Sequence, residues 1–329
     1  MAKVYRVLSL AVSLLGCLCT QSPARAQTQD YPSRIIRIVV PFVAGGGLDG
    51  IARLLAAKMQ DEFKQTVLVE NRGGQAGNLG AAFVAKSPAD GYTMLITTSG
   101  FTVAPSLWTN LRYDTIKDFQ PLTMLAESAI WLAVDPKLPV KNLTDLIALA
   151  KSKPGALNYG SSGFGNPLHL AMEMFMRQTD TRFVMVPFTN DAQIITAMTS
   201  GDVHVAMIPF LISRSHVETG ALRALGFTRS ERWPLSPATP TLAEQGLPGF
   251  DTRGWQGLLL PAGTARPIVD KLYATIKDIM ATDDMKKRYD AFGSMPLVNS
   301  PDAFASRIVA EVEHFKKITQ QIGLTPKVE

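Results

Sequence analysis

The stretch IRIVVPFVAGGGLDGIARLLAAKMQ, residues 36–60, decides how the chain begins to fold. A run of β-branched residues meets a triple glycine, and apolar residues then recur at helical spacing. This pattern predicts a buried strand, a tight turn and an amphipathic helix. Gly45, Gly47 and Gly50 match the G-x-G-x-x-G pattern, and an acid, Glu70, follows about twenty residues later, as in dinucleotide sites. Such a turn points backbone N–H groups at any anion, so a dinucleotide, a small carboxylate and a purely structural turn all remain open.

The N-terminus has the features of a secretory signal peptide. Basic residues precede an apolar run, and Ala24 and Ala26 place small residues where a signal peptidase cuts. We therefore expect residues 1–26 to be removed after Ala26 and the mature chain to work in the periplasm. The sequence LLGC ending at Cys17 also resembles a bacterial lipobox, which leaves a lipid-anchored lipoprotein as the alternative.

The composition of the mature chain argues against several kinds of functional site. Both cysteines, Cys17 and Cys19, lie in the predicted signal, so we expect no disulfide, thiolate nucleophile or thiolate metal ligand. The formal net charge of +5 falls to about +2 when Lys3, Arg6 and Arg25 leave with the signal. No basic cluster interleaved with aromatic residues remains, so we expect no nucleic-acid partner. The four histidines lack metal-binding spacing, and we expect no metal and no cofactor.

The βαβαβ pattern at the start of the chain predicts a parallel, doubly wound sheet. The alternation of strands and helices then continues as a second α/β unit, which predicts two doubly wound α/β domains. A mature length of about three hundred residues agrees with two domains. Apolar segments at 127–135 and 252–263 flank the second α/β unit, and we place two hinge crossings there. The first domain then comprises residues 27–127 and 252–329, with the C-terminal helices packed back on it, and the second comprises residues 128–251.

A second glycine turn occurs in NYGSSGFGNPLHLAMEMF, residues 158–175. Ser161 and Ser162 supply hydroxyl groups, and Asn166 is placed to cap a helix that begins at Pro167. Ligands of open α/β sheets bind beyond the carboxyl ends of the strands, where both glycine turns are predicted. We therefore expect two helix N-termini, one from each domain, to face each other across one anion.

Segments along essentially the whole mature chain resemble the solute receptors of tripartite tricarboxylate transporters, the Bug family. These segments are residues 31–59, 67–96, 159–175 and 239–267, and the VEN and DGYT motifs at 69–71 and 90–93 are the most specific. The resemblance implies a type II periplasmic-binding-protein fold that closes like a flytrap. It implies capture of a small organic acid through backbone groups and two ordered waters, and delivery to a membrane permease of one large and one small subunit. It therefore leads us to expect a monomeric receptor that is not an enzyme.

Carried over by position, the resemblance implies four ligand-binding loops. They contain Phe42, Val43, Ala44, Gly45, Gly46 and Asp49 in the first turn; Thr97, Thr98 and Ser99 after the third strand; Ser161, Ser162, Gly163 and Asn166 in the second-domain turn; and Phe188, Thr189 and Asn190 after the strand VMVPF. Backbone amides of the two glycine turns are expected to bind the carboxylate. Asp49 is expected to hold its turn, because a carboxylate repels an anion.

Differences from the family pattern concern the kind of ligand. Leu48 stands where relatives often carry Thr, Ser or Pro, PFTN at 187–190 replaces PYKG, and Ile208 stands where they often carry Asp. If these positions face the cleft, the ligand has an apolar body, such as an aromatic or long aliphatic carboxylate. If Leu48 and Ile208 point into the core, this interpretation loses its basis. If the ligand does contain an aromatic ring, the residues available to flank it are Phe164, Phe188 and Phe210.

The alternative from another class is a secreted serine esterase or hydrolase with Ser161 or Ser162 as its nucleophile. GSSGFG does not match the G-x-S-x-G of a nucleophile elbow. The sequence also marks no histidine as the oriented base that such a mechanism requires. We therefore expect no catalytic residue, and we expect His169, one turn into the helix after the serines, to pack and hold the loop.

Overall fold

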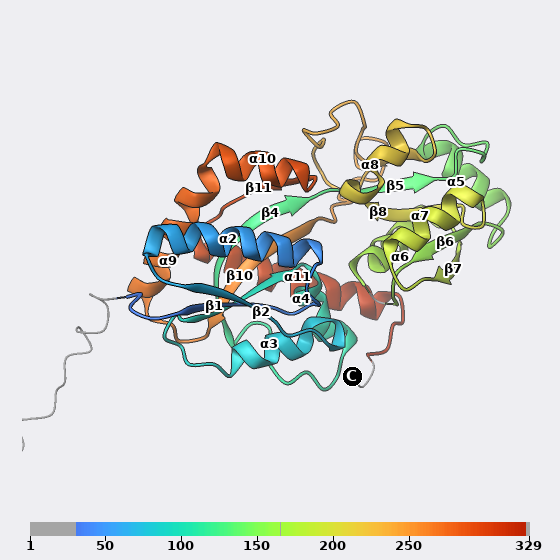
Figure 1. Ribbon diagram of the computed structural model, residues 1–329. Coiled ribbons are helices and arrows are strands. Elements are labelled where there is room, and N and C mark those ends of the chain that lie inside the picture. Colours follow the sequence, from blue (N-terminus) through green and yellow to red (C-terminus); the bar gives the residue numbers. More distant parts are fainter. Residues whose placement is uncertain (1–30, 165, 327–329) are drawn as a thin grey trace, which may run out of the picture. The chain divides into compact units, whose positions relative to one another are not determined.

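The computed structural model describes residues 31–164 and 166–326. Over these ranges the chain forms a six-stranded and a five-stranded β-sheet, each with helices on both faces (Figure 1). This alternation confirms the predicted α/β class. The predicted signal peptide, its cleavage after Ala26 and the alternative lipidation of Cys17 lie outside the described residues.

The six-stranded sheet is built around the first predicted strand. In spatial order its strands are β11 (Ser294–Pro296), β4 (Phe119–Ser128), β10 (Gly254–Pro261), β3 (Thr93–Thr98), β1 (Ile36–Val40) and β2 (Val67–Asn71). β1 runs parallel to both of its neighbours, β2 and β3. β10 is antiparallel to β3 and β4, and β11 is antiparallel to β4. The sheet is therefore parallel only across β2, β1 and β3, and the first glycine turn follows β1.

Apolar faces of helices cover both sides of this sheet. The elements are α2 (Gly47–Phe63), the 3₁₀ helix η1 (Gln75–Gly77), α3 (Asn78–Ala85), α4 (Gly100–Leu107), α9 (Arg266–Ala281), α10 (Asp283–Ala291) and α11 (Pro301–Gln321). Val39 packs in one buried cluster with residues of α3, α4 and α11, including Phe101 and Phe304. Since side chains alternate along a strand, Ile38 faces the opposite side, where α2 contacts α9. The C-terminal helices thus pack on the first sheet, as expected.

The five-stranded sheet has the same layered construction. Its strands in spatial order are β7 (Val184–Pro187), β6 (Asn158–Ser161), β8 (Val205–Pro209), β5 (Ile130–Val134) and β9 (Arg223–Phe227). Its helices are α5 (Leu143–Ser152), α6 (Pro167–Thr179), α7 (Asp191–Ser200) and α8 (Phe210–Glu218). Leu132 packs with α5 and α6 on one face. Trp131 and Ile208 pack with residues of α7 and with Phe210, at the start of α8, on the other.

The chain passes between the two sheets at two places. It leaves β4 after Ser128 and enters β5 at Ile130, and it leaves β9 after Phe227 and returns in β10 at Gly254. The segments predicted as hinges are themselves largely buried strands, because β5 and most of β10 are apolar and pack in the cores. The domain boundaries at 127/128 and 251/252 remain a prediction.

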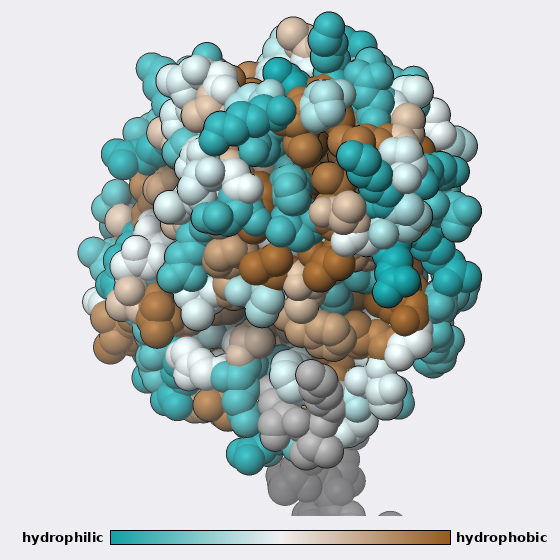
Figure 2. All heavy atoms as spheres, turned by 90° about the vertical axis from the view of Figure 1, so that its right-hand side faces the viewer, coloured by the Kyte–Doolittle hydropathy of each residue, from teal (hydrophilic) through white to brown (hydrophobic). Residues whose placement is uncertain are grey.

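Polar residues separate the apolar areas on the face shown in Figure 2, where brown patches are divided by teal side chains. Individual exposed apolar side chains are normal on proteins, whereas a large continuous apolar area marks an interface. In the part of the chain that the structure describes, no helix has the length and apolarity needed to cross a membrane.

Candidate ligand-binding site

A pocket of about 250 Å³ lies where β3 ends. Thr98, the last residue of β3, and Gly100, the first of α4, both line it. Asn78 at the start of α3 and Asn166 at the start of α6 complete its polar part. The other lining residues are Phe42, Ala76, Gly77, Ala81, Thr97, Ser99, Phe101, Val103, Ala104, Leu107, Trp108, Tyr113 and Pro167.

Three helices therefore begin at the wall of one pocket. The first N–H groups of a helix have no partner inside that helix. The helix dipole also makes this end partly positive. An anion such as a carboxylate is stabilised at these positions without a basic side chain.

The polar residues around this wall are held by hydrogen bonds to their neighbours. Ser99 N–H donates to the carbonyl of Trp255 at 3.1 Å, and the carbonyl of Ser99 accepts from Thr102 Oγ1 at 2.8 Å. The hydroxyl of Tyr113 donates to Asn78 Oδ1 at 2.8 Å. These hydrogen bonds within the protein hold the start of α4 in place, so its geometry does not depend on a ligand.

Asn166 caps α6 as the sequence indicates. Its Oδ1 accepts from His169 N–H at 2.7 Å, and its Nδ2 donates to Ser162 Oγ at 3.1 Å. Ser161 is 2% exposed and donates from Oγ to the carbonyl of Gly163 at 3.0 Å. The two serines thus contribute to the shape of the turn.

The remainder of the pocket wall is apolar. The rings of Phe101 and Tyr113 lie nearly parallel, with an interplanar angle of 3° and centroids 5.8 Å apart. Leu107 and Trp108 at the end of α4 extend this wall and are partly exposed. None of the described residues that line the pocket is Lys, Arg, His, Asp or Glu.

The first glycine turn is held by a buried carboxylate. Asp49, in the first turn of α2, is 4% exposed and accepts from Gly45 N–H at 2.9 Å, Arg53 Nε at 3.0 Å and Asn71 Nδ2 at 2.9 Å. Asn71 Nδ2 also donates to the carbonyl of Phe42 at 3.2 Å. The hydrogen bond from Arg53, followed by that from Gly45, lowers the pKa of Asp49 from 3.8 to about 2. We call Asp49, Arg53 and Asn71 the turn clamp.

The pocket contains only some of the residues predicted to bind ligand. Those that line it are Phe42, Thr97, Thr98, Ser99 and Asn166. Those outside its wall are Val43, Ala44, Gly45, Gly46, Asp49, Ser161, Ser162, Gly163, Phe188, Thr189 and Asn190. The α2 helix start therefore does not line this pocket, whereas the α4 start does. A ligand-binding role for each of these residues remains a prediction.

Two residues used to infer an apolar ligand lie in the core. Ile208 is 0% exposed, and Phe210 is 1% exposed with its ring 5.1 Å from that of Trp131. The interpretation that these two side chains face a ligand is therefore wrong. Strand pairing places Ile208 opposite Trp131 on the face that α7 covers, and this pairing is not visible in the local sequence.

Sequence reasoning missed the segment FTVAPSLWTNLRY, residues 101–113, which supplies most of the apolar wall. The sequence could have indicated this segment, because it directly follows a predicted strand. A helix in that position places its first turn at the carboxyl end of the sheet, where ligands bind. Asn78 was also missed, since its role depends on Tyr113, which is 35 residues away in the sequence.

Behind the second-domain turn lies a small polar cluster. His169 is 3% exposed, with Nε2 3.5 Å from Glu173 Oε1, and Tyr159 donates its hydroxyl to the same oxygen at 2.9 Å. Burial raises the pKa of Glu173, but hydrogen bonds from His169 and Tyr159 outweigh burial and lower the pKa below its ordinary value. The Phe164 ring lies 4.9 Å from the His169 ring. The cluster therefore supports the turn from behind.

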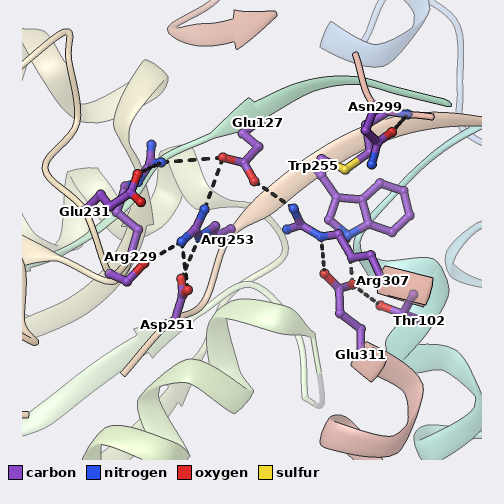
Figure 3. A network of polar contacts seen from close by, with 12 residues as sticks. Thr102, Glu127, Arg229, Glu231, Asp251, Arg253, Trp255, Asn299, Arg307 and Glu311 are labelled. Atoms are coloured by element: carbon purple, nitrogen blue, oxygen red, sulfur yellow. Dashed lines mark hydrogen bonds and ion pairs between the residues drawn. The ribbon is translucent and has the colours of Figure 1, made fainter. Parts of the chain in front are cut away.

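An ion-pair network connects the two strand crossings (Figure 3). Glu127, at the end of β4, lies 2.7 Å from Arg307 Nη1, 3.5 Å from Arg229 Nη2 and 3.6 Å from Arg253 Nη1. Arg307 also pairs with Glu311 of α11. Glu311 accepts from the Trp255 indole and from the Thr102 hydroxyl. Among the residues that the structure describes, no group of three or more His, Cys, Asp or Glu is arranged to hold a metal ion.

Comparisons with known proteins give a consistent result. A model of the tripartite tricarboxylate transporter family receptor matches residues 51–324. The chain is 33% identical over 307 residues to the UPF0065 protein in the tcbD-tcbE intergenic region of Pseudomonas sp. (strain P51), covering 93% of this chain and 91% of that protein. It is 31% identical over 325 residues to Protein BugT of Bordetella pertussis, covering 98% of each chain.

Solved structures resemble the fold along nearly the same length. R. palustris Rpa4515, solved with adipate, superposes with a TM-score of 0.78 at 34% identity, covering 90% of this chain and 100% of that one. MatC (Rpa3494) from Rhodopseudomonas palustris, solved with bound malate, gives a TM-score of 0.72 at 30% identity, covering 88% of this chain and 99% of that one.

Proposed function

The chain belongs to the tripartite tricarboxylate transporter receptor family, and we propose that it captures a small organic carboxylate in the pocket at the end of β3. This membership confirms the Bug-family resemblance and the type II periplasmic-binding-protein fold expected from the sequence. Members of the family are periplasmic binding receptors, and the family is not one of enzymes.

The convergence of three helix starts on one uncharged pocket carries the proposal. The carboxylate binds to the first amides of α4 and to the hydroxyl of Thr98, while Asn166, which caps α6, forms part of the polar wall. Asn78, at the start of α3, contributes to the same polar wall. The relatives solved with adipate and malate support a carboxylate as the ligand class.

The remaining steps follow the family pattern. The chain is exported and cut after Ala26, and it works as a monomer in the periplasm. Residues 128–251 close as one domain over the domain formed by 27–127 and 252–329, and the turn clamp keeps Phe42 at the pocket during closure. The closed form then delivers the ligand to a permease of one large and one small subunit. Binding drives this change only if the closed form has the higher affinity.

We propose no catalytic activity. The hydroxyl of Ser161 is buried and donates within its own turn, and Ser162 accepts from Asn166. His169 faces Glu173, and this pair is placed to support the helix start. The serine esterase alternative is not supported by the family to which the chain belongs.

A thermal-shift screen of the mature chain against mono-, di- and tricarboxylates tests the proposal. A ligand at one hundred times its Kd stabilises the folded state by about 2.7 kcal/mol, so a true ligand raises the melting temperature by several degrees. A panel in which no carboxylate raises it would reject the proposal.

Thr98→Asp places a negative charge in the pocket, with the neutral Thr98→Asn as the matched control. Two like charges about 5 Å apart repel by about 3 kcal/mol at an effective dielectric of 20, which is roughly a hundredfold in affinity. We expect Thr98→Asp to lose carboxylate binding in calorimetry and Thr98→Asn, whose amide still donates a hydrogen bond, to bind at least tenfold more tightly than Thr98→Asp. If the two variants bound the carboxylate equally well, the carboxylate would not lie next to Thr98, and the proposed site would be wrong.

A further inference from the structure

We infer that the pocket selects monocarboxylates with an apolar tail over di- and tricarboxylates. This inference rests on the proposed function and specifies its ligand class. It starts from the division of the pocket wall, which is polar around Thr98 and Gly100 and apolar around Phe101, Leu107 and Trp108.

The two ends of α4 set the length of the ligand. A helix rises 1.5 Å per residue, so Gly100 and Leu107 lie about 10 Å apart along its axis. A carboxylate held at the start of α4 therefore extends its other end toward Leu107 and Trp108. Because these two side chains are partly exposed, a tail that covers them removes apolar surface from water.

The pocket has room for an apolar tail. Its volume of about 250 Å³ accommodates acids of the size of hexanoate and benzoate. Citrate carries three carboxylates, so charge rather than size separates it from these acids.

A second carboxylate has no cation to pair with at the apolar end. The described lining residues include no Lys, Arg or His. A carboxylate that covers the partly exposed apolar side chains of Leu107 and Trp108 loses part of its hydration and gains no partner, which disfavours it. Helix starts supply the positive field at the polar end, and this field decreases within the first turn of the helix. The end of α4 at Leu107 carries the opposite, partly negative sign.

The aromatic part of the wall is rigid. Phe101 and Tyr113 are 5% and 7% exposed and lie parallel, and the Tyr113 hydroxyl is tied to Asn78 at the start of α3. Both residues line the pocket, so the tail lies against aromatic side chains that their neighbours hold in place. The Tyr113 hydroxyl also links the apolar wall to the polar one, so the two cannot move apart independently.

Leu107 offers a gain-of-function test because it is half-buried at the end of the wall. Leu107→Lys adds an ammonium group on a flexible stem near the end of α4, where it can pair with the second carboxylate of hexanedioate. Leu107→Met is the matched control, since it keeps the apolar volume. Unliganded melting temperatures of both variants establish that they fold.

Calorimetry with acetate, hexanoate, benzoate and hexanedioate gives the result. Each buried methylene tightens binding roughly fourfold, so the unaltered chain and Leu107→Met bind hexanoate at least tenfold tighter than acetate and than hexanedioate. Leu107→Lys gains at least tenfold for hexanedioate and loses affinity for hexanoate. Equal binding of hexanoate and hexanedioate by the unaltered chain, or no gain in Leu107→Lys, overturns this inference alone. Failure of the chain to bind any carboxylate overturns the proposed function as well.

Discussion

Asp49→Asn removes the charge at the centre of the turn clamp. The lowering of the Asp49 pKa from 3.8 to about 2 corresponds to at most about 2.4 kcal/mol of folding free energy. Its main partner Arg53 is 54% exposed, so solvent screens part of the interaction, and we expect a loss of about 1.5 kcal/mol. A chain of about 300 residues unfolds with an entropy of about 0.6 kcal/mol/K, so the melting temperature falls by about 2–3 °C.

The same pKa shift fixes how the loss depends on pH. The pKa of Asp49 is lower in the folded state, so its contribution is fully present above the unfolded value of 3.8 and disappears as pH falls through about 2. At pH 3 roughly half of the contribution remains. The gap in stability between the original chain and Asp49→Asn should therefore shrink from pH 7 to pH 3.

Urea denaturation at pH 7, 5, 4 and 3 measures this gap. Asp61→Asn is the matched control, because Asp61 is exposed on the same helix, and it should change stability little at any of these pH values. Carboxylate affinity of Asp49→Asn should fall as well, since Asn71 and Asp49 together hold the Phe42 segment at the pocket. A gap that stays constant over this pH range, or an Asp49→Asn variant as stable as the original chain at pH 7, would refute this account of the clamp.

Three further substitutions and one matched control test other parts of the structure. Glu127→Gln removes the carboxylate that three guanidinium groups share. Because each of them keeps another acid, Glu311, Asp251 or Glu231, we expect a loss of about 2 kcal/mol in urea denaturation. An unchanged stability would contradict the importance of the network. Gly257→Ala brings a Cβ to 2.5 Å from the Phe304 ring, so the melting temperature should drop by several degrees, corresponding to about 1–3 kcal/mol. Asn166→Ala removes the cap of α6 and should lower both stability, by about 1 kcal/mol, and carboxylate affinity. Asn142→Ala is the matched control, because it removes the equivalent cap of α5. It should lower stability by a similar amount and leave carboxylate affinity unchanged. If Asn142→Ala also lowered the affinity, the α6 cap would have no special role in binding.

Local sequence patterns were sufficient to predict features that depend on a single element or a single turn. The apolar run at 36–40 forms β1, the glycines that follow it lead into α2, and Asn166 caps α6 as its side chain and the adjacent Pro167 indicate. The family could also be assigned from ordered segments, because these carry many residues in fixed spacing. For the strand, the helix start and the cap, the required information lies within a few residues along the chain.

The location of the pocket required contacts between distant residues. The sequence offered α2 and α6 as the helix starts that share a ligand, whereas α3, α4 and α6 begin at the pocket. Phe101 and Tyr113 became part of its wall only through packing against each other and through the bond from Tyr113 to Asn78. A helix start can be predicted locally, but which starts face one another depends on the order of the strands.

The sequence by itself determined the α/β alternation, the glycine turns and the α6 cap, because propensity and capping act between near neighbours. It also indicated the family, through segments that occur in a fixed order along the chain. Only the tertiary structure decided that Ile208 is a core residue, since strand pairing selects the face on which a side chain lies. It also decided that Glu127 meets Arg229, Arg253 and Arg307, which are more than 100 residues away along the chain. Contacts at such separations form only when whole sheets and helices pack, and no local pattern encodes that packing.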